Sequence, residues 1–151
     1  MIILEDLLYT EEHLWVKPDQ DRKRAMIGVT DYGQEKIGMI TSIDLPSVGD
    51  EFVVGDCFGT LENSIGEVTE LITPVSGEVA TVNEQLPETP GFINDDPYDD
   101  GWIMVIRLVH PEELDDLMDS QEYEEYVEEA RIKDEEEEDL EDPEDLLEVE
   151  E

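Results

Sequence analysis

Basic residues are scarce in this chain of 151 residues, which has 8 Lys and Arg against 45 Asp and Glu. The formal net charge of −37 produces a field that repels phosphate backbones and anionic lipids. We therefore expect protein partners with basic surfaces, no nucleic acid and no membrane. An acidic, lysine-poor composition is also typical of adaptation to high salt, where screening makes dense like charge tolerable, and both explanations stay open.

Cysteine is almost absent, and no apolar run is long enough to cross a bilayer. Cys57 stands alone, so an internal disulfide is excluded, and its apolar strand context predicts a small buried side chain. The first residues include Glu5 and Asp6 and no basic leader, so no signal peptide is expected. These absences predict a soluble cytoplasmic protein.

Histidine is also rare, which argues against an enzyme. His13 and His110 are too few for a Ser-His-Asp triad or a histidine metal site unless both converge. The acidic run 95–100 lacks the ligand spacing, glycine and closing glutamate of an EF-hand, so weak cation binding is expected but no dedicated metal site. Trp15 and Trp102 lie in apolar strand patterns and are predicted to pack in the core.

What is present is a series of short β-type runs separated by turn residues, which predicts a small barrel or sandwich. A two-turn helix is expected over Thr30–Ile37, with Thr30 as N-cap and Gly38 closing it. Residues 84–101 read as a long irregular segment. The expected strands are 8–10, 14–17, 24–29, 39–45, 51–54, 57–61, 68–73, 78–83 and 102–109.

The pattern changes at the C-terminal end. Pro111 suits the first position of a helix and Ser120 the N-cap of a second one. From Pro111 onward the chain has 23 acidic and two basic residues, and 134–151 are expected to be a disordered acidic tail. The predicted organisation is a β domain over 1–110, C-terminal helices over 111–133 packed on it, and the tail.

Several motifs occur in an order that resembles the glycine cleavage system H protein. The blocks that carry the resemblance are 12–16 (EHLWV), 27–38 (IGVTDYGQEKIG), 44–50 (DLPSVGD), 58–59 (FG), 74–79 (PVSGEV), 82–84 (VNE), 94–98 (NDDPY) and 101–102 (GW). The resemblance runs from about residue 9 to about residue 130. It implies a mainly β, lipoyl-domain-like barrel-sandwich hybrid with a short internal helix and C-terminal helices.

The resemblance also implies lipoate in amide linkage to a lysine at the tip of a hairpin, a residue that this chain lacks. The tip, Asn63, Ser64, Ile65, Gly66 and Glu67, is one residue longer than usual, and the lysine position falls on Ile65 or on Gly66. Only a long, flexible amine gives a stable amide that can swing between enzymes. No lysine occurs between Lys36 and Lys133, and we expect Lys36 to lie away from the tip. A hydroxyl at Ser64 or a thiol at Cys57 would give only a weaker ester or thioester. We therefore expect a degenerate lipoylation site without a bound cofactor.

A second departure concerns the groove that receives the loaded arm in the family. Between His13 and Trp15 the family usually has a glutamate, whose carboxylate would pair with a cationic cargo, and this chain has Leu14. His13 and Leu14 are accordingly expected to border a vestigial arm groove.

Three hypotheses follow for the function. The first is a non-catalytic binding or regulatory paralogue that docks on lipoate-handling enzymes: the glycine decarboxylase, the aminomethyltransferase, dihydrolipoyl dehydrogenase or a lipoate ligase. The second is a working carrier modified at an unexpected lysine, Lys36 or Lys133. The third is an acidic interaction module that acts through its C-terminal tail.

Overall fold

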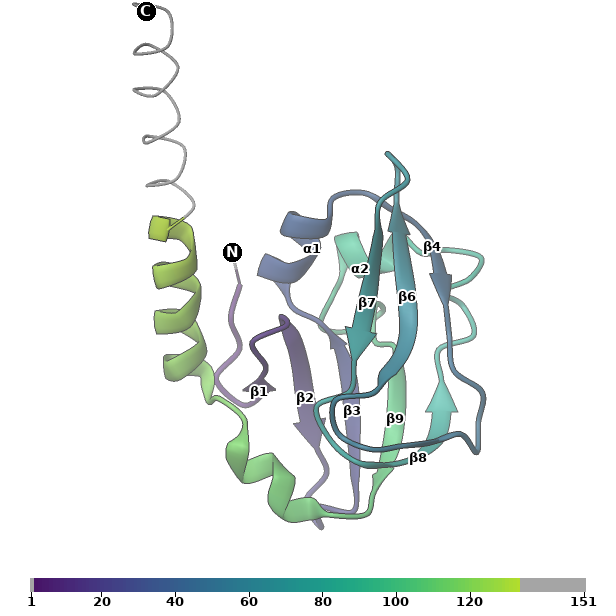
Figure 1. Ribbon diagram of the computed structural model, residues 1–151, viewed down its shortest axis with the longest axis vertical. Helices are drawn as coiled ribbons and strands as arrows, with labels where there is room; N and C mark the ends of the chain where they lie inside the picture. The colour runs from purple at the N-terminus through teal and green to yellow at the C-terminus, as the bar shows by residue number, and fades with distance from the viewer. Residues whose placement is uncertain (1, 134–151) are drawn as a thin grey trace, which may run out of the picture.

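The computed structural model describes residues 2–133, which form two antiparallel β-sheets with short helices around them (Figure 1). The predicted tail, 134–151, lies outside the described residues. The larger sheet has the strand order β1 (Leu8–Tyr9), β2 (Leu14–Pro18), β3 (Arg24–Val29), β9 (Met104–Leu108), β8 (Gly77–Val82) and β5 (Glu51–Phe52). The smaller sheet has the order β4 (Ile40–Asp44), β6 (Cys57–Asn63) and β7 (Val68–Ile72). The tip of the β6–β7 hairpin projects at one end (Figure 1).

Helix α1 (Asp31–Ile37) has the ends that the sequence predicts. The Thr30 side-chain oxygen accepts a hydrogen bond from the backbone N–H of Gly33 at 2.9 Å, which caps the N-terminus. Gly38 takes a φ of 88° at the other end, where a side chain would be strained. A second short helix, α2 (Phe92–Asp95), interrupts the segment that the sequence predicted to be irregular.

Two groups of buried side chains hold the fold together. The larger one gathers apolar residues of both sheets, including Ile27 of β3, Leu61 of β6 and Ile106 of β9. The smaller one is aromatic and contains Trp15 and Tyr123, with Trp102 partly buried against it. The prediction of core packing is confirmed for Trp15, whereas Trp102 is only partly buried at the edge of the same group.

The C-terminal part of the described chain differs in detail from the prediction. Pro111–Asp116 form a 3₁₀ helix, η1, and 120–133 are α-helical. This second helix is capped by Asp119, whose carboxylate accepts from the N–H of Glu122 at 2.8 Å while the Glu122 carboxylate accepts from the N–H of Asp119 at 3.1 Å. Ser120 is therefore not the N-cap, because the reciprocal pair requires a glutamate three residues after the cap. Across residues 2–133, no helix has the length and apolar character needed to span a bilayer.

Helix 120–133 is fixed to the β domain through Tyr123. The rings of Tyr9 and Tyr123 stack with their centroids 4.5 Å apart. Just before the helix, Met118 and Tyr9 exchange two backbone hydrogen bonds of 2.8 and 2.9 Å. Burial of these aromatic rings away from water, together with that of Val127, helps to hold the helix in place.

Gly28 provides a test of the packing between β2 and β3. It lies opposite Trp15, and a Cβ at this position would come within 2.6 Å of the Trp15 ring. The indole cannot move aside without breaking its hydrogen bond to the Pro97 carbonyl at 2.9 Å. We expect Gly28→Ala to lower the free energy of unfolding by roughly 1–3 kcal/mol in urea titrations.

Gly91→Ala is the matched control, because a Cβ there would have no atom within 4 Å and the φ is −62°. Its unfolding free energy should stay within about 0.5 kcal/mol of the parent protein. Equal losses in the two variants would contradict this account of the Trp15 contact.

Candidate functional site: the hairpin tip and its groove

One side chain, Asn63, organises the tip of the β6–β7 hairpin. Its amide oxygen accepts from the N–H of Ile65 at 3.1 Å and from the N–H of Glu67 at 2.9 Å. Its amide nitrogen donates to the Ile37 carbonyl at 2.9 Å and to the Glu67 carboxylate at 3.0 Å. Asn63 is nearly buried, at 6% exposure, so these bonds are shielded from water. The tip is consequently held in one shape and tied to the end of helix α1.

The backbone of the tip forms a three-residue loop closed by a left-handed residue. The N–H of Gly66 donates to the Asn63 carbonyl at 3.0 Å, and the N–H of Asn63 donates to the Glu67 carbonyl at 3.0 Å. Gly66 has a φ of 85°, which strains any residue with a Cβ. Ile65, by contrast, has an ordinary φ and a side chain that is 78% exposed. Of the two positions that the sequence left open for the missing lysine, Ile65 is the one at which a long side chain fits.

The residues present do not fit a covalently attached lipoyl group at this tip. The exposed Ile65 side chain is a hydrocarbon, and Gly66 has no side chain at all. The Ser64 backbone N–H donates to the Met39 carbonyl at 2.9 Å, which fixes its position beside β4. No amine therefore stands at the apex of the tip.

A depression of about 330 Å³ lies beside the hairpin, and His13, one of the two residues expected for the arm groove, borders it. Its walls come from the β1–β2 corner, helix α1 and the tip of the hairpin with the start of β7. The lining residues are Glu12, His13, Gly33, Lys36, Ile37, Asn63, Glu67, Val68 and Thr69. The expectation that Lys36 lies away from the tip is wrong, because Lys36 borders the same depression as Asn63 and Glu67. The sequence could not show this, since it depends on how α1 packs on the hairpin.

His13 borders the depression, and its ring is fixed by the aromatic cluster. Its Nδ1 lies 3.0 Å from the hydroxyl of Tyr123, which lies 2.7 Å from the Thr30 hydroxyl. Burial lowers the pKa of His13, and the nearby Lys36 ammonium lowers it further. The lowered pKa favours the neutral imidazole at pH 7, and His13 serves as a hydrogen-bonding corner residue.

Leu14 does not border the depression. It is 2% exposed and packs in the larger core group, because alternate residues of β2 point to opposite faces. Its side chain therefore contributes to the hydrophobic core, and only His13 of the two predicted groove residues lines the groove.

Cys57 is exposed, which corrects the prediction of a buried side chain. The pairing of β6 with β7 shifts in register between Cys57 and Gly59, so the alternation of inward and outward side chains breaks there. Its thiol donates to the carbonyl of Gly59 at 3.2 Å.

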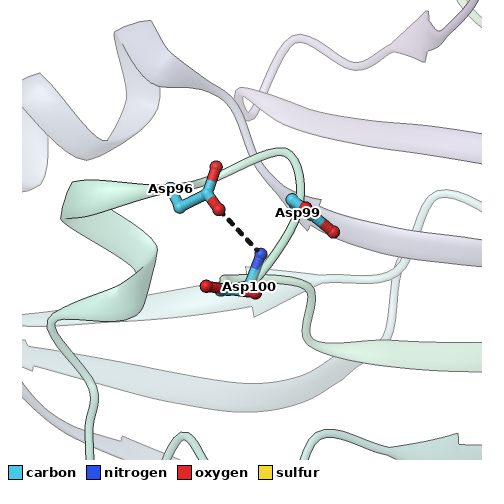
Figure 2. Close-up of side chains that lie close together, drawn as sticks. All are labelled: Asp96, Asp99 and Asp100. Carbon is cyan, nitrogen blue, oxygen red and sulfur yellow. Dashed lines mark hydrogen bonds between the residues drawn. The ribbon is translucent and has the colours of Figure 1, made fainter.

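The acidic run that the sequence singled out does not line the depression beside the tip. Asp96, Asp99 and Asp100 gather in the loop after α2, and Figure 2 shows the N–H of Asp100 donating to the Asp96 carboxylate at 3.3 Å. One ligand oxygen from each lies within 4.8 Å of the others, but two of the three side chains are exposed, and exposed acidic groups are common without an ion. Weak cation binding there stays a prediction.

The two histidines do not share partners among the described residues. His13 contacts tyrosine rings, whereas His110 precedes η1 with its Nδ1 3.4 Å from the Glu112 carboxylate. The convergence that a catalytic or metal site would require is therefore not found within residues 2–133.

Sequence reasoning missed the importance of Asn63 and of Tyr123. Asparagine before a turn is a recognised signal for side-chain to backbone hydrogen bonds, so the two bonds within the tip had a local signature. The bond from Asn63 to Ile37 and the contact of Tyr123 with His13 join residues 26 and 110 positions apart, respectively. Such contacts leave no local trace in a single sequence.

The role of Asn63 can be tested by Asn63→Ala, which removes all four side-chain hydrogen bonds. We expect the free energy of unfolding to fall by roughly 1–2 kcal/mol and the amide hydrogens of Ile65 and Glu67 to exchange about tenfold faster. Hydrogen exchange followed by NMR measures both sites. Ser64→Ala is the matched control, since its side chain is exposed and only its backbone is bonded. Unchanged exchange in Asn63→Ala would show that the backbone alone holds the tip.

Comparison with known proteins agrees with this geometry. The family model described as glycine cleavage H-protein matches residues 7–130. The chain is 45% identical over 121 residues to the glycine cleavage system H protein of Halothermothrix orenii, covering 80% of this chain and 92% of the relative. It is also 45% identical over 121 residues to that of Coprothermobacter proteolyticus, covering 80% and 94%.

Among solved structures, the glycine cleavage system H protein from Mycobacterium marinum superimposes with a TM-score of 0.74 at 27% identity, covering 85% of this chain and 98% of that one. The predicted fold class, a mainly β lipoyl-domain-like barrel-sandwich hybrid with short helices, is thereby confirmed. With its two sheets, its projecting hairpin and these relatives, the chain belongs to the glycine cleavage H-protein family.

Proposed function

We propose that this chain is a member of the family that does not carry a lipoyl group and that works by binding other proteins in the cytoplasm. The observation that carries the proposal is the side chain at the apex of the tip, where an exposed Ile65 stands at the position best suited to a long acceptor side chain. Amide formation requires a nucleophilic amine, which a hydrocarbon cannot supply. The retained scaffold supports binding to the enzymes that handle lipoylated relatives: glycine decarboxylase, aminomethyltransferase, dihydrolipoyl dehydrogenase or a lipoate ligase.

A non-catalytic role fits the remaining chemistry of the groove. His13 is neutral and engaged with Tyr123, and no second histidine approaches it within the described residues. The groove therefore offers a fixed shape rather than an acid-base pair. In this proposal the protein regulates or scaffolds its partners by occupying their docking surfaces.

One observation favours a second candidate, a working carrier modified at Lys36. This lysine borders the depression beside the tip, together with Asn63 and Glu67. An arm attached there would start from the groove wall instead of the apex. Lys133, the other lysine considered as an unexpected modification site, lies at the end of the described helix.

A lipoylation assay separates the two candidates. The purified protein is incubated with lipoate, ATP and a lipoate ligase, and its intact mass is measured. We expect no added mass on the parent chain and a lipoyl-sized increase on Ile65→Lys, because this position is open and exposed. Gly66→Lys should be modified far less, since its backbone φ of 85° strains a side chain.

If the parent chain gains mass, peptide mapping identifies the modified residue. A lipoyl group on Lys36 or Lys133, in the assay or in protein purified from its own cells, would overturn the proposal and support the carrier. Modification of Ile65→Lys alone would show that the scaffold still presents its tip to the ligase and that the missing amine is the sole obstacle.

A further inference from the structure

We infer that the hairpin tip is itself the docking element and that it inserts into an apolar recess with a basic rim on a lipoate-handling enzyme. This inference rests on the proposed function and adds the partner surface that it requires. The tip patch consists of Met39, Ile65 and Val68, which are 68%, 78% and 62% exposed.

The three side chains belong to one end of the smaller sheet. Ile65 lies within the hairpin turn and Val68 directly after it, and Met39 is joined to the turn by the hydrogen bond between its carbonyl and the N–H of Ser64. In a chain with so much charge, three large apolar side chains at one projecting end create a surface that water solvates poorly. Burial of such a patch against an apolar surface is a source of binding free energy.

The tip is also preorganised for insertion. Asn63 holds the N–H groups of Ile65 and Glu67, and Gly66 accommodates the left-handed step of the turn. A loop already fixed in its bound shape loses little conformational freedom on binding, so more of the apolar contact energy appears as affinity. Ile65, at the centre of this loop, is the side chain expected to contribute most.

The charges around the tip patch define the rim of the partner. Glu62 lies opposite Val68 in the register of the hairpin, Glu67 precedes Val68, and Glu35 borders the same depression as Met39. All three carboxylates are exposed. Lys36 is the nearby cation, and its ammonium lies 5.8 Å from the centre of the Tyr32 ring. An apolar recess surrounded by Lys or Arg complements this arrangement.

The same charges exclude two other occupants. An anionic lipid surface would be repelled by the carboxylates beside the apolar side chains. A second copy of this chain would bring together two molecules of net charge −37. An apolar recess with a basic rim on another protein is the remaining complement.

The experiment compares the affinities of the parent chain, Ile65→Ser and Val53→Ser for each of the four enzymes named above, taken from the same organism. Val53 is the matched control, because it is 65% exposed on the turn after β5 and also has a β-branched apolar side chain replaced by serine. We expect Ile65→Ser to weaken binding by roughly 10- to 100-fold and Val53→Ser to leave it unchanged. Both sites are exposed, so the unfolding midpoint of each variant should match that of the parent.

Each outcome has a separate meaning. If the parent chain binds none of the enzymes, the proposed function fails and this inference fails with it. If the parent binds but Ile65→Ser binds equally well, or Val53→Ser loses as much, the tip is not the docking element and the proposed function stands without it. The basic rim is tested by measuring affinity at increasing salt concentration. Affinity should fall less steeply with salt for Glu62→Gln than for the parent chain, and an equal salt dependence in the two proteins would overturn the basic rim.

Discussion

The structure around the candidate site depends on two side-chain amides, the buried Asn63 and the partly buried Asn94, that fasten the end of helix α1. Asn63 donates to the Ile37 carbonyl from the hairpin side, and Asn94 donates to the Gly38 carbonyl at 2.8 Å from the α2 side. Asn94 also accepts from the N–H of Ile40 at 2.9 Å, at the start of β4. The last carbonyls of a helix need partners, and these amides supply them while positioning the smaller sheet. Helix α1, the hairpin tip and β4 therefore keep their relative positions as one unit.

Local patterns in the sequence predicted much of this fold because the responsible forces act between near neighbours. The β2 and β3 strands and helix α1 were placed close to their observed bounds, and Thr30 caps α1 through a residue three positions away. The exposed Cys57 and the position of Lys36 escaped prediction, because each depends on register or packing between distant segments. The candidate site is harder to predict from the sequence than the fold for the same reason, because its walls come from three separate elements.

The resemblance to a family identified the hairpin as the expected functional element. The conformation and exposure of its individual residues determine which chemistry the hairpin can support. The one-residue extension of the tip left two positions for the acceptor lysine in the sequence. The left-handed φ of Gly66 and the 78% exposure of Ile65 separate them in the structure. Backbone conformation thus resolved an ambiguity that sequence matching left open.

Retention of the fold and loss of the acceptor are compatible because they rest on different atoms. The hydrogen bonds that shape the tip use the Asn63 amide and backbone groups of Ile65, Gly66 and Glu67. None uses the side chain at position 65, which points into solvent. Replacing a lysine there removes an attachment point without weakening the scaffold, so stability places no constraint on that residue. In the proposed function, the role of the protein resides in what the tip presents, and an exposed isoleucine on a rigid loop would present a contact surface instead of a covalent arm.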